Sequence, residues 1–148
     1  MRLITIDKSR LKKYTKDPEM LQDSERPSAL VIQLKYKGHR YDFAIPLRSN
    51  ISGSVPKDHY YPLPSRSTTR PGNHHGIHYV KMFPVKRAWV HPFHTENNMF
   101  ASIIKAYIDK NEKQIVKDCQ MYLQKYEAGD IPEFATDIDL LLEIMMNM

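Results

Sequence analysis

The chain has 148 residues, of which 41% are apolar and 26% are charged, and its formal net charge at pH 7 is +5. This size and composition indicate an ordinary globular chain with a buried core, and we expect residues 1–148 to form a single domain. No apolar run approaches the roughly 18 residues of a membrane-spanning helix. The absence of a long apolar stretch after Met1, together with the single Cys119, predicts no signal peptide and a cytoplasmic protein.

The first third of the chain predicts β-strands. Residues 2–6 favour a short strand, and residues 9–16 favour one or two helical turns. Residues 29–36 and 40–47 both alternate and are joined by Lys37-Gly38-His39, which is typical of a β-hairpin. We expect one apolar face on each strand: Leu30, Ile32, Leu34 and Tyr36 on the first, and Tyr41, Phe43, Ile45 and Leu47 on the second.

The apolar pattern stops after Leu47, where we expect the second strand to end. Residues 48–73 are rich in Ser, Gly, Pro and basic side chains and predict a long loop. A loop of this length in a compact domain is usually functional or disordered. Residues 76–83 and 86–91 then predict two more strands, the second centred on Trp89.

The last third of the chain predicts helices. Thr95 resembles an N-cap, and apolar residues recur at helical spacing over residues 100–126, with a break or kink at 109–111. Gly129 predicts a C-terminal stop, and Thr136 with Asp137 opens a last short helix. The predicted fold class is α+β: a mostly antiparallel sheet with helices packed on it and a helical C-terminal part.

Positive charge is concentrated in the first two thirds of the chain. Residues 1–95 carry 17 Lys and Arg against 7 Asp and Glu, whereas residues 96–148 carry 5 against 10. All 7 histidines lie between His39 and His94. This asymmetry indicates that one surface is basic and binds a polyanion, while the opposite surface is acidic. The alternative is that the basic surface is only solvated and binds nothing.

The first candidate site combines Arg48 and Ser49 with Lys57 and His59. Cleaving RNA without a metal needs a base for the 2′-hydroxyl, an acid for the leaving 5′-oxygen, and donors or cations that stabilise the phosphorane. Imidazole suits the acid or base role. Lys57 and Arg48 suit phosphate charge, and Ser49 can donate a hydrogen bond to the phosphate. The alternative is that Ser49 caps a turn and His59 is a surface histidine.

The second candidate is the run from His74 to His78, with Lys81 beyond it. Clustered histidines suggest a metal, but neighbouring strand residues point to opposite faces, and no helix supplies an i, i+4 pair. We therefore expect no metal and no cofactor, and we predict that His78 acts in catalysis and that Lys81 contacts RNA. A zinc-dependent hydrolase built on His74, His75 and His78 is the alternative.

The third candidate is the set of aromatic and basic residues in the predicted loop. Unpaired bases stack on such rings for about 1–3 kcal/mol each. Tyr60 and Tyr61 are the better stacking candidates, because Tyr36 and Trp89 are expected in the core. Arg66 and Arg70 are expected to contact phosphates.

Four short motifs carry a family resemblance through their joint order. They are Arg26-Pro27 before an apolar strand, Gly38-His39-Arg40-Tyr41, Pro46-Leu47-Arg48-Ser49, and residues 76–85, which end in Met82-Phe83-Pro84-Val85. In this order they resemble the ToxN/AbiQ family of toxins from type III toxin–antitoxin systems, and most closely its CptN-like branch. The resemblance covers roughly residues 1–130.

The resemblance implies a bacterial endoribonuclease with a sheet core similar to that of the MazF/Kid toxins. Such proteins cleave RNA without metal and leave a 2′,3′-cyclic phosphate and a 5′-hydroxyl. Their antitoxin is an RNA pseudoknot, which the toxin cuts from a repeat precursor and then binds in its basic groove. Toxin and RNA form closed complexes, and many such systems act in phage defence. The implied partners are therefore a cognate small RNA and cellular or phage RNA as substrate, with no membrane.

The family motif Pro-Leu-Thr-Ser-x-Lys matches residues 46–51, so that Ser49 matches the family serine. Arg48 stands where the family has threonine, and Ile51 stands where it has lysine. We infer that Lys57 or His59 replaces this missing cation. The family's upstream lysine finds only Arg26 nearby, and its upstream tyrosine falls near Gln22 without a match.

The sequence thus predicts a sequence-preferring, metal-independent endoribonuclease toxin of the MazF/Kid-like fold. The predicted catalytic residues are Ser49, Lys57, His59 and His78, and the predicted RNA-binding residues are Arg26, Arg48, Tyr60, Arg66, Arg70 and Lys81. The alternative is a non-catalytic RNA-binding domain that uses the same basic surface.

Overall fold

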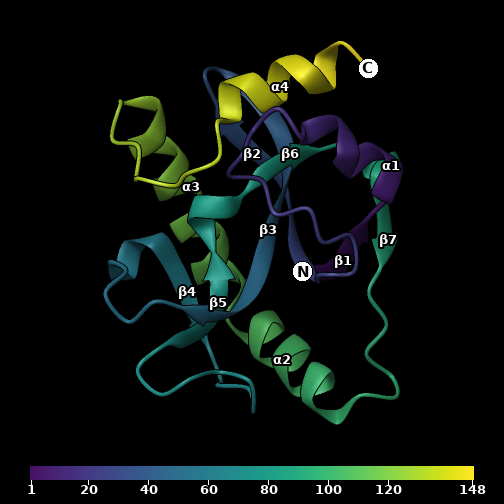
Figure 1. Cartoon of the computed structure of the whole chain (residues 1–148), viewed down its shortest axis with the longest axis vertical. Helices are drawn as coiled ribbons and strands as arrows, with labels where there is room; N and C mark the ends of the chain where they lie inside the picture. Colours follow the sequence, from purple (N-terminus) through teal and green to yellow (C-terminus); the bar gives the residue numbers. More distant parts are fainter.

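All 148 residues are described in the computed structural model, and they form one seven-stranded sheet with helices on both faces (Figure 1). The strands are β1 (Arg2–Ile6), β2 (Ser28–Tyr36), β3 (His39–Ile51), β4 (Tyr60–Leu63), β5 (His74–His78), β6 (Phe83–Val85) and β7 (Val90–Pro92). The strand order is β4-β5-β3-β2-β1-β7, with β6 paired to β3, and every pair is antiparallel. The predicted α+β class is confirmed.

The helices are α1 (Lys8–Leu11), α2 (Met99–Lys110), α3 (Glu112–Glu127) and α4 (Ile138–Met146). Short 3-10 turns occur at η1 (Lys12–Tyr14), η2 (Lys57–His59), η3 (Tyr79–Lys81) and η4 (Arg87–Trp89). No helix has both the length and the apolar character needed to cross a membrane.

The central hairpin of β2 and β3 forms as predicted, but β2 contains a bulge. Its register with β3 shifts between Val31 and Leu34, and Gln33 has a φ of 58°. The bulge adds one residue to the strand, so the side chains after it point to the opposite face of the sheet from the one that simple alternation predicts. Leu30 therefore packs in one core, Leu34 and Tyr36 pack in the other, and Ile32 is exposed. The prediction of a single apolar face on this strand was wrong for that reason.

An apolar core lies on each face of the sheet. One core joins β2, β3 and β5 to α2 and α3, and it includes Phe43, Ile77, Ile104, Ile115 and Leu123. The other joins β1, β3 and β6 to α1 and α4, and it includes Ile4, Ala44, Phe83, Leu11 and Leu141. Each fully buried side chain of this size contributes roughly 1.5–3 kcal/mol. The cores hold β3, at the centre of Figure 1, rigidly in place.

Two parts of the predicted loop over residues 48–73 form regular elements, namely residues 48–51 and 57–63. β3 continues to Ile51, whose buried side chain keeps the strand attached to β5. η2 and β4 follow, and β4 pairs with β5, so the connecting loop is only 64–73. Tyr60 and Leu63 are buried by this pairing, which depends on residues distant in sequence.

The following elements also differ from the predicted strands. Instead of one strand over residues 76–83, β5 ends at His78 and β6 starts at Phe83, with the turn η3 between them. Trp89 lies in η4 rather than in a strand. α2 is capped by Asn98, whose Oδ1 accepts a hydrogen bond from the Ala101 amide at 3.0 Å, and not by Thr95.

The remaining helix boundaries agree with the predictions. α2 and α3 are separated at Asn111, and Gly129, with a φ of 97°, follows the end of α3. Asp137 caps α4 by accepting a hydrogen bond from the Leu140 amide at 3.1 Å.

Candidate functional site

Two hollows border β3, η2 and α3. The arginine hollow has a volume of about 180 Å³ and is lined by Asp23, Glu25, Arg26, Pro27, Leu47, Ser49, Arg66 and His75. The α3 pocket has a volume of about 290 Å³ and is lined by Lys57, Asp58, His59, Tyr79, Asp118, Met121, Tyr122, Lys125, Asp130 and Pro132. Arg48 and His78 line neither hollow, but Arg48 feels the charge of Arg26 from the first, and His78 feels that of His59 from the second.

The pairing of β3 with β5 places Arg48 next to His78. Arg48 lies opposite Gly76 in the ladder, and residues two apart on a strand share a face, so His78 is a diagonal neighbour of Arg48. The register then shifts between Arg48 and Ile51. This second bulge lies at Ser49 and Asn50, and bulges of this kind redirect side chains near functional sites.

Two guanidinium groups lie close together without an acidic partner. Arg26 donates from Nη1 to the carbonyl of Leu47 at 3.2 Å, while its Nε is buried and forms no hydrogen bond within the protein. Burial lowers the pKa of Arg48, and the charge of Arg26 lowers it further. A buried donor beside two like charges is an arrangement that an anion would stabilise.

His78 is buried and held in one tautomer. Arg48 Nη1 lies 3.4 Å from His78 Nδ1, and because a guanidinium only donates hydrogen bonds, Nδ1 must accept and Nε2 must carry the proton. Burial lowers the pKa of His78 to about 3, with smaller effects from Arg48, Lys81 and His59. His78 is therefore neutral at pH 7 and offers an N–H donor at Nε2.

Ser49 is bonded to the loop that joins β4 and β5. Its Oγ accepts a hydrogen bond from Arg66 Nη1 at 3.1 Å, which brings the predicted serine and one predicted arginine together. Asn50 fixes the same loop, because its Oδ1 accepts from the Arg70 amide at 2.7 Å and its Nδ2 donates to the Thr68 carbonyl at 3.0 Å. The loop is thus held over the arginine hollow.

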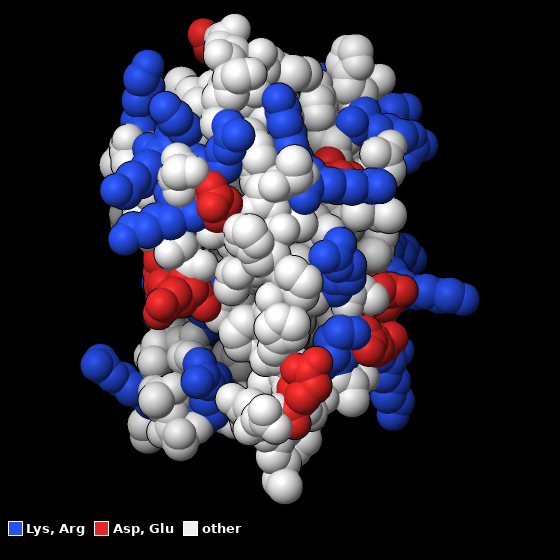
Figure 2. All heavy atoms as spheres, turned by 90° about the vertical axis from the view of Figure 1, so that its right-hand side faces the viewer, with Lys and Arg blue, Asp and Glu red and all other residues white.

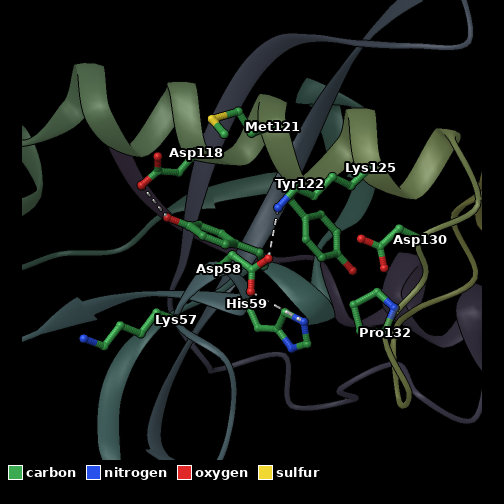
Figure 3. Close-up of a pocket in the computed structure, with 10 residues that line it drawn as sticks. Lys57, Asp58, His59, Asp118, Met121, Tyr122, Lys125, Asp130 and Pro132 are labelled. Carbon is green, nitrogen blue, oxygen red and sulfur yellow. Dashed lines mark hydrogen bonds and ion pairs between the residues drawn. The ribbon is translucent and has the colours of Figure 1, made fainter.

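η2 presents Lys57 and His59 at the α3 pocket (Figure 3). Between them, Asp58 accepts a hydrogen bond from Lys125 Nζ at 3.1 Å, and this interaction holds the pKa of Asp58 below its usual range. His59 Nε2 lies 3.9 Å from Asp58 Oδ1. His59 is only partly exposed, and a proton-exchanging group here would be oriented by the carboxylate next to it.

Three of the predicted RNA contacts do not join this site. Lys81 is 7% exposed, and its Nζ donates to the Glu19 carboxylate at 2.7 Å, the Glu19 carbonyl at 3.2 Å and the Phe134 carbonyl at 2.8 Å. It has no N–H left for RNA and instead joins two segments of the fold. Tyr60 is buried against His74, with ring centroids 5.2 Å apart, so its face is closed to a base. Arg70 lines neither hollow, but it is exposed in loop 64–73 without an ion pair and stays a predicted RNA contact.

The β5 histidines do not converge. His74 stacks on Tyr60, His75 Nδ1 donates to the Pro64 carbonyl at 2.7 Å, and His78 contacts Arg48. No group of three or more His, Cys, Asp or Glu side chains is placed to hold a metal ion. The zinc site considered from the sequence therefore has no support in the geometry.

Sequence reasoning missed the contribution of α3. Asp118, Tyr122 and Lys125 line the pocket beside η2, although more than 50 residues separate them from His59. In the sequence they read as the polar face of an ordinary amphipathic helix. Their side chains reach the pocket only because α3 packs across β2 and faces η2.

Comparison with known proteins gives a consistent result for the fold. No known family model and no curated protein matches the sequence. Among solved structures, a chain from a bacterial antiviral system regulated by a processed non-coding RNA aligns with 17% identity and a TM-score of 0.75, covering 100% of this chain and 99% of that one. A second chain comes from a type III toxin–antitoxin system in which a non-coding RNA pseudoknot selectively inhibits the toxin. It aligns with 13% identity and a TM-score of 0.71, covering 99% of this chain and 96% of that one. AbiQ, a lactococcal anti-phage endoribonuclease that belongs to the type III toxin–antitoxin system, aligns with 16% identity and a TM-score of 0.70. The alignment covers 99% of this chain and 96% of AbiQ.

The chain has the ToxN/AbiQ fold. The resemblance inferred from short motifs is confirmed at this level and extends over the whole chain. The CptN-like branch stays a prediction. At 13–17% identity the likeness of these ToxN/AbiQ structures establishes the architecture, and the roles of individual residues are argued from their own geometry below.

Proposed function

We propose that this chain is an endoribonuclease and acts as the toxin of a type III toxin–antitoxin system. The observation that carries the proposal is the buried, unpartnered Arg26 Nε beside Arg48, adjoining Ser49 and Arg66, in a fold shared with an endoribonuclease. This arrangement offers donors and positive charge for a phosphodiester. His59 supplies a group for proton transfer nearby.

The proposed reaction is an internal transesterification. The ribose 2′-oxygen loses its proton and attacks the adjacent phosphorus, and the bond from phosphorus to the 5′-oxygen breaks while that oxygen is protonated. The products are a 2′,3′-cyclic phosphate and a 5′-hydroxyl. No oxidant, nucleotide or metal is required for these steps to balance.

The arginine hollow would hold the reacting phosphate. Arg26, Arg66 and Ser49 line the hollow and supply hydrogen-bond donors, two of them charged, and the neighbouring Arg48 and His78 Nε2 are proposed to add further donors. Because Nδ1 of His78 is occupied by Arg48, we assign His78 to stabilising the phosphorane rather than to accepting a proton.

Proton transfer is assigned to His59, with Lys57 as an adjacent cation. Both line the α3 pocket from η2, which follows Ile51, the residue at the position of the family's lysine, by a short insertion. The pH dependence of kcat/KM decides which transfer His59 catalyses. Loss of the acidic limb in His59→Ala identifies a base, and loss of the alkaline limb identifies an acid.

The RNA partner follows from the same proposal. The solved neighbours include systems controlled by a processed non-coding RNA and by an RNA pseudoknot, which supports a cognate small RNA as the inhibitor of this protein. We propose that the chain cuts this RNA from a repeat precursor, is held with it in a closed toxin–RNA complex, and acts in the cytoplasm on cellular or phage RNA in phage defence.

The deciding experiment incubates the purified protein with RNA in EDTA and analyses the RNA ends. We expect cleavage with cyclic phosphate ends, and a loss of about 10²–10⁴-fold in His59→Ala and a large loss in Ser49→Ala, with RNA binding largely retained. His94→Ala, a change at an exposed histidine outside both hollows, is the matched control. Intact RNA after long incubation, with binding preserved, would instead identify a non-catalytic RNA-binding domain. Chelator-sensitive cleavage that zinc restores would contradict the metal-independent mechanism.

A further inference from the structure

The α3 pocket contains polar groups that the proposed chemistry does not use. Lys57 and His59 form one wall, from η2. The other wall comes from α3 and the segment after it, where Asp118, Tyr122 and Asp130 face the same space (Figure 3).

Tyr122 carries a hydroxyl without a partner. The residue is 6% exposed, and its Oη forms no hydrogen bond within the protein. Its ring lies along the pocket, and the hydroxyl points toward the side formed by Asp130 and Pro132 (Figure 3). Burial raises the pKa of Tyr122 above its usual range, with smaller contributions from Tyr126 and Asp130, so the hydroxyl keeps its proton. Buried hydroxyls are nearly always hydrogen-bonded, and this one is free to bond to a ligand.

The carboxylates of the pocket differ in whether they already accept hydrogen bonds from the protein. Asp58 is bonded to Lys125 at 3.1 Å, and Asp118 accepts from Gln114 at 2.7 Å and from Tyr79 at 3.4 Å. Asp130 forms no side-chain hydrogen bond or ion pair. The far side of the pocket therefore offers a free acceptor beside a free hydroxyl.

The volume and the neighbours of the pocket define the ligand class. About 290 Å³ is near the lower end of small-molecule sites, where a single planar group is accommodated. His59, the proposed proton-transfer group, lines the near side of the pocket, so the proposed reaction puts the base next to the scissile phosphate at this pocket. A neutral group with N–H donors fits the free acceptor and hydroxyl best.

We propose that the α3 pocket receives one unpaired nucleobase next to the scissile phosphate and selects a base that carries an amino group. Asp130 accepts from the amino N–H, and Tyr122 Oη bonds to the neighbouring ring nitrogen or carbonyl, as in other sites that read the Watson–Crick edge of an unpaired base. Uracil fits less well, because its one N–H lies between two carbonyl oxygens that a carboxylate repels. This inference rests on the proposed RNA substrate and assigns the residues that set its sequence preference.

The test measures binding separately from cleavage. Short 2′-O-methyl oligonucleotides cannot be cut by attack of the 2′-oxygen, and a set that differs at one position in a run of uridine reports base preference by fluorescence anisotropy. We expect the unchanged protein to bind oligonucleotides with adenine, cytosine or guanine at that position more tightly than uridine alone. Asp130→Asn should reduce the preference by about 10-fold or more, as expected for a hydrogen bond to a charged group, and Tyr122→Phe by a smaller factor.

Matched controls separate recognition from folding. Glu133→Gln and Tyr107→Phe change the same chemical groups at exposed positions outside the pocket and should leave the preference unchanged. Tyr122→Phe should keep or raise the midpoint of urea unfolding, since the buried hydroxyl has no internal partner to lose.

The outcomes distinguish this inference from the nuclease proposal. Equal affinity for all four bases, or a preference that survives both pocket substitutions, would refute the base pocket even if unmodified RNA is cut. A preference that both substitutions reduce, in a protein that leaves unmodified RNA intact, would support the pocket while refuting the endoribonuclease activity.

Discussion

His78 shows how one contact assigns a chemical role. The guanidinium of Arg48 occupies Nδ1, so the proton lies on Nε2, and burial keeps the ring neutral. In the sequence, His78 and His59 are both histidines of a basic segment. The different roles proposed for them follow from burial and from the partner across the ladder, which a sequence pattern does not specify.

This assignment predicts a pH dependence of stability. The pKa of His78 is about 3 in the folded protein, whereas unfolded histidine titrates near 6.5, so between these values the unfolded state binds more protons. The free energy of unfolding should therefore fall as the pH is lowered from 7 to 5. Between pH 7 and pH 5, the free energy of unfolding of His78→Gln should fall by about 1–2 kcal/mol less than that of the unchanged protein.

Urea unfolding at the two pH values measures the difference. His94→Gln, at an exposed site, serves as the control and should behave like the unchanged protein. His75 is also buried with a lowered pKa, so some acid sensitivity should persist in His78→Gln. An identical pH response in His78→Gln would show that His78 is not held neutral.

At the scale of elements, alternation and turn chemistry predicted the hairpin but not its bulge. The turn at Lys37 and Gly38 has positive φ at both positions, 48° and 79°, as two-residue hairpin turns require. The bulge at Gln33 depends on Asp42 of the partner strand, whose carboxylate accepts from the Gln33 amide at 3.0 Å and from Arg87 Nε at 2.9 Å. That arrangement is assembled from three separate segments, and no local pattern encodes it.

The bulge gives a prediction about two neighbouring positions of one strand. Gln33 has the left-handed φ of 58°, which costs a residue with a side chain about 1–2 kcal/mol. Gln33→Gly should therefore raise the free energy of unfolding by about 0.5–1 kcal/mol, whereas Lys35→Gly, in the regular part of the strand, should lower it by a similar amount. Chemical denaturation of the two variants checks the opposite signs. A loss of stability in both would mean that the bulge does not need the left-handed conformation.

The candidate site was only partly predictable for the same physical reason. Arg48 and Ser49 could be selected because they follow a clear run of strand residues, and Lys57 and His59 because they lie in the basic segment predicted as a loop over residues 48–73. β4 was missed since its apolar positions, Tyr60 and Leu63, are too few to show a period. The carboxylates and the tyrosine of the α3 pocket become neighbours of η2 only through tertiary packing.

At the scale of the whole molecule, positive charge is not confined to the arginine hollow. α1 and η1 carry exposed, unpaired Lys8, Lys12 and Lys13, and Arg10 lies over the ring of Trp89. This segment lies beside β7, at the opposite edge of the sheet from β4 (Figure 1). Figure 2 shows the corresponding face, with Lys and Arg gathered over its upper half. A long RNA could contact both regions, whereas a short one could not.

This distribution predicts a salt dependence that varies with RNA length. For a folded RNA of pseudoknot size, replacing Lys12 and Lys13 with Ala should reduce the slope of log K against log salt by up to about one per residue that contacts a phosphate. For a short single strand, the same change should have no effect, while Arg66→Ala reduces the slope for both. Filter binding over a salt series measures these slopes. Equal slopes for the lysine variants and the unchanged protein on both RNAs would confine binding to the arginine hollow.

The closeness of Arg26 and Arg48 has a consequence for the lifetime of the protein. Two neighbouring cations, one with an unbonded buried donor, oppose the folded state, and an anion between them removes that opposition. RNA is then a folding ligand, which shifts the equilibrium by an amount that grows with its concentration relative to Kd. We expect the RNA-free protein to be the form that proteases degrade fastest. In the proposed toxin–antitoxin system, loss of the antitoxin RNA would therefore shorten the lifetime of the protein.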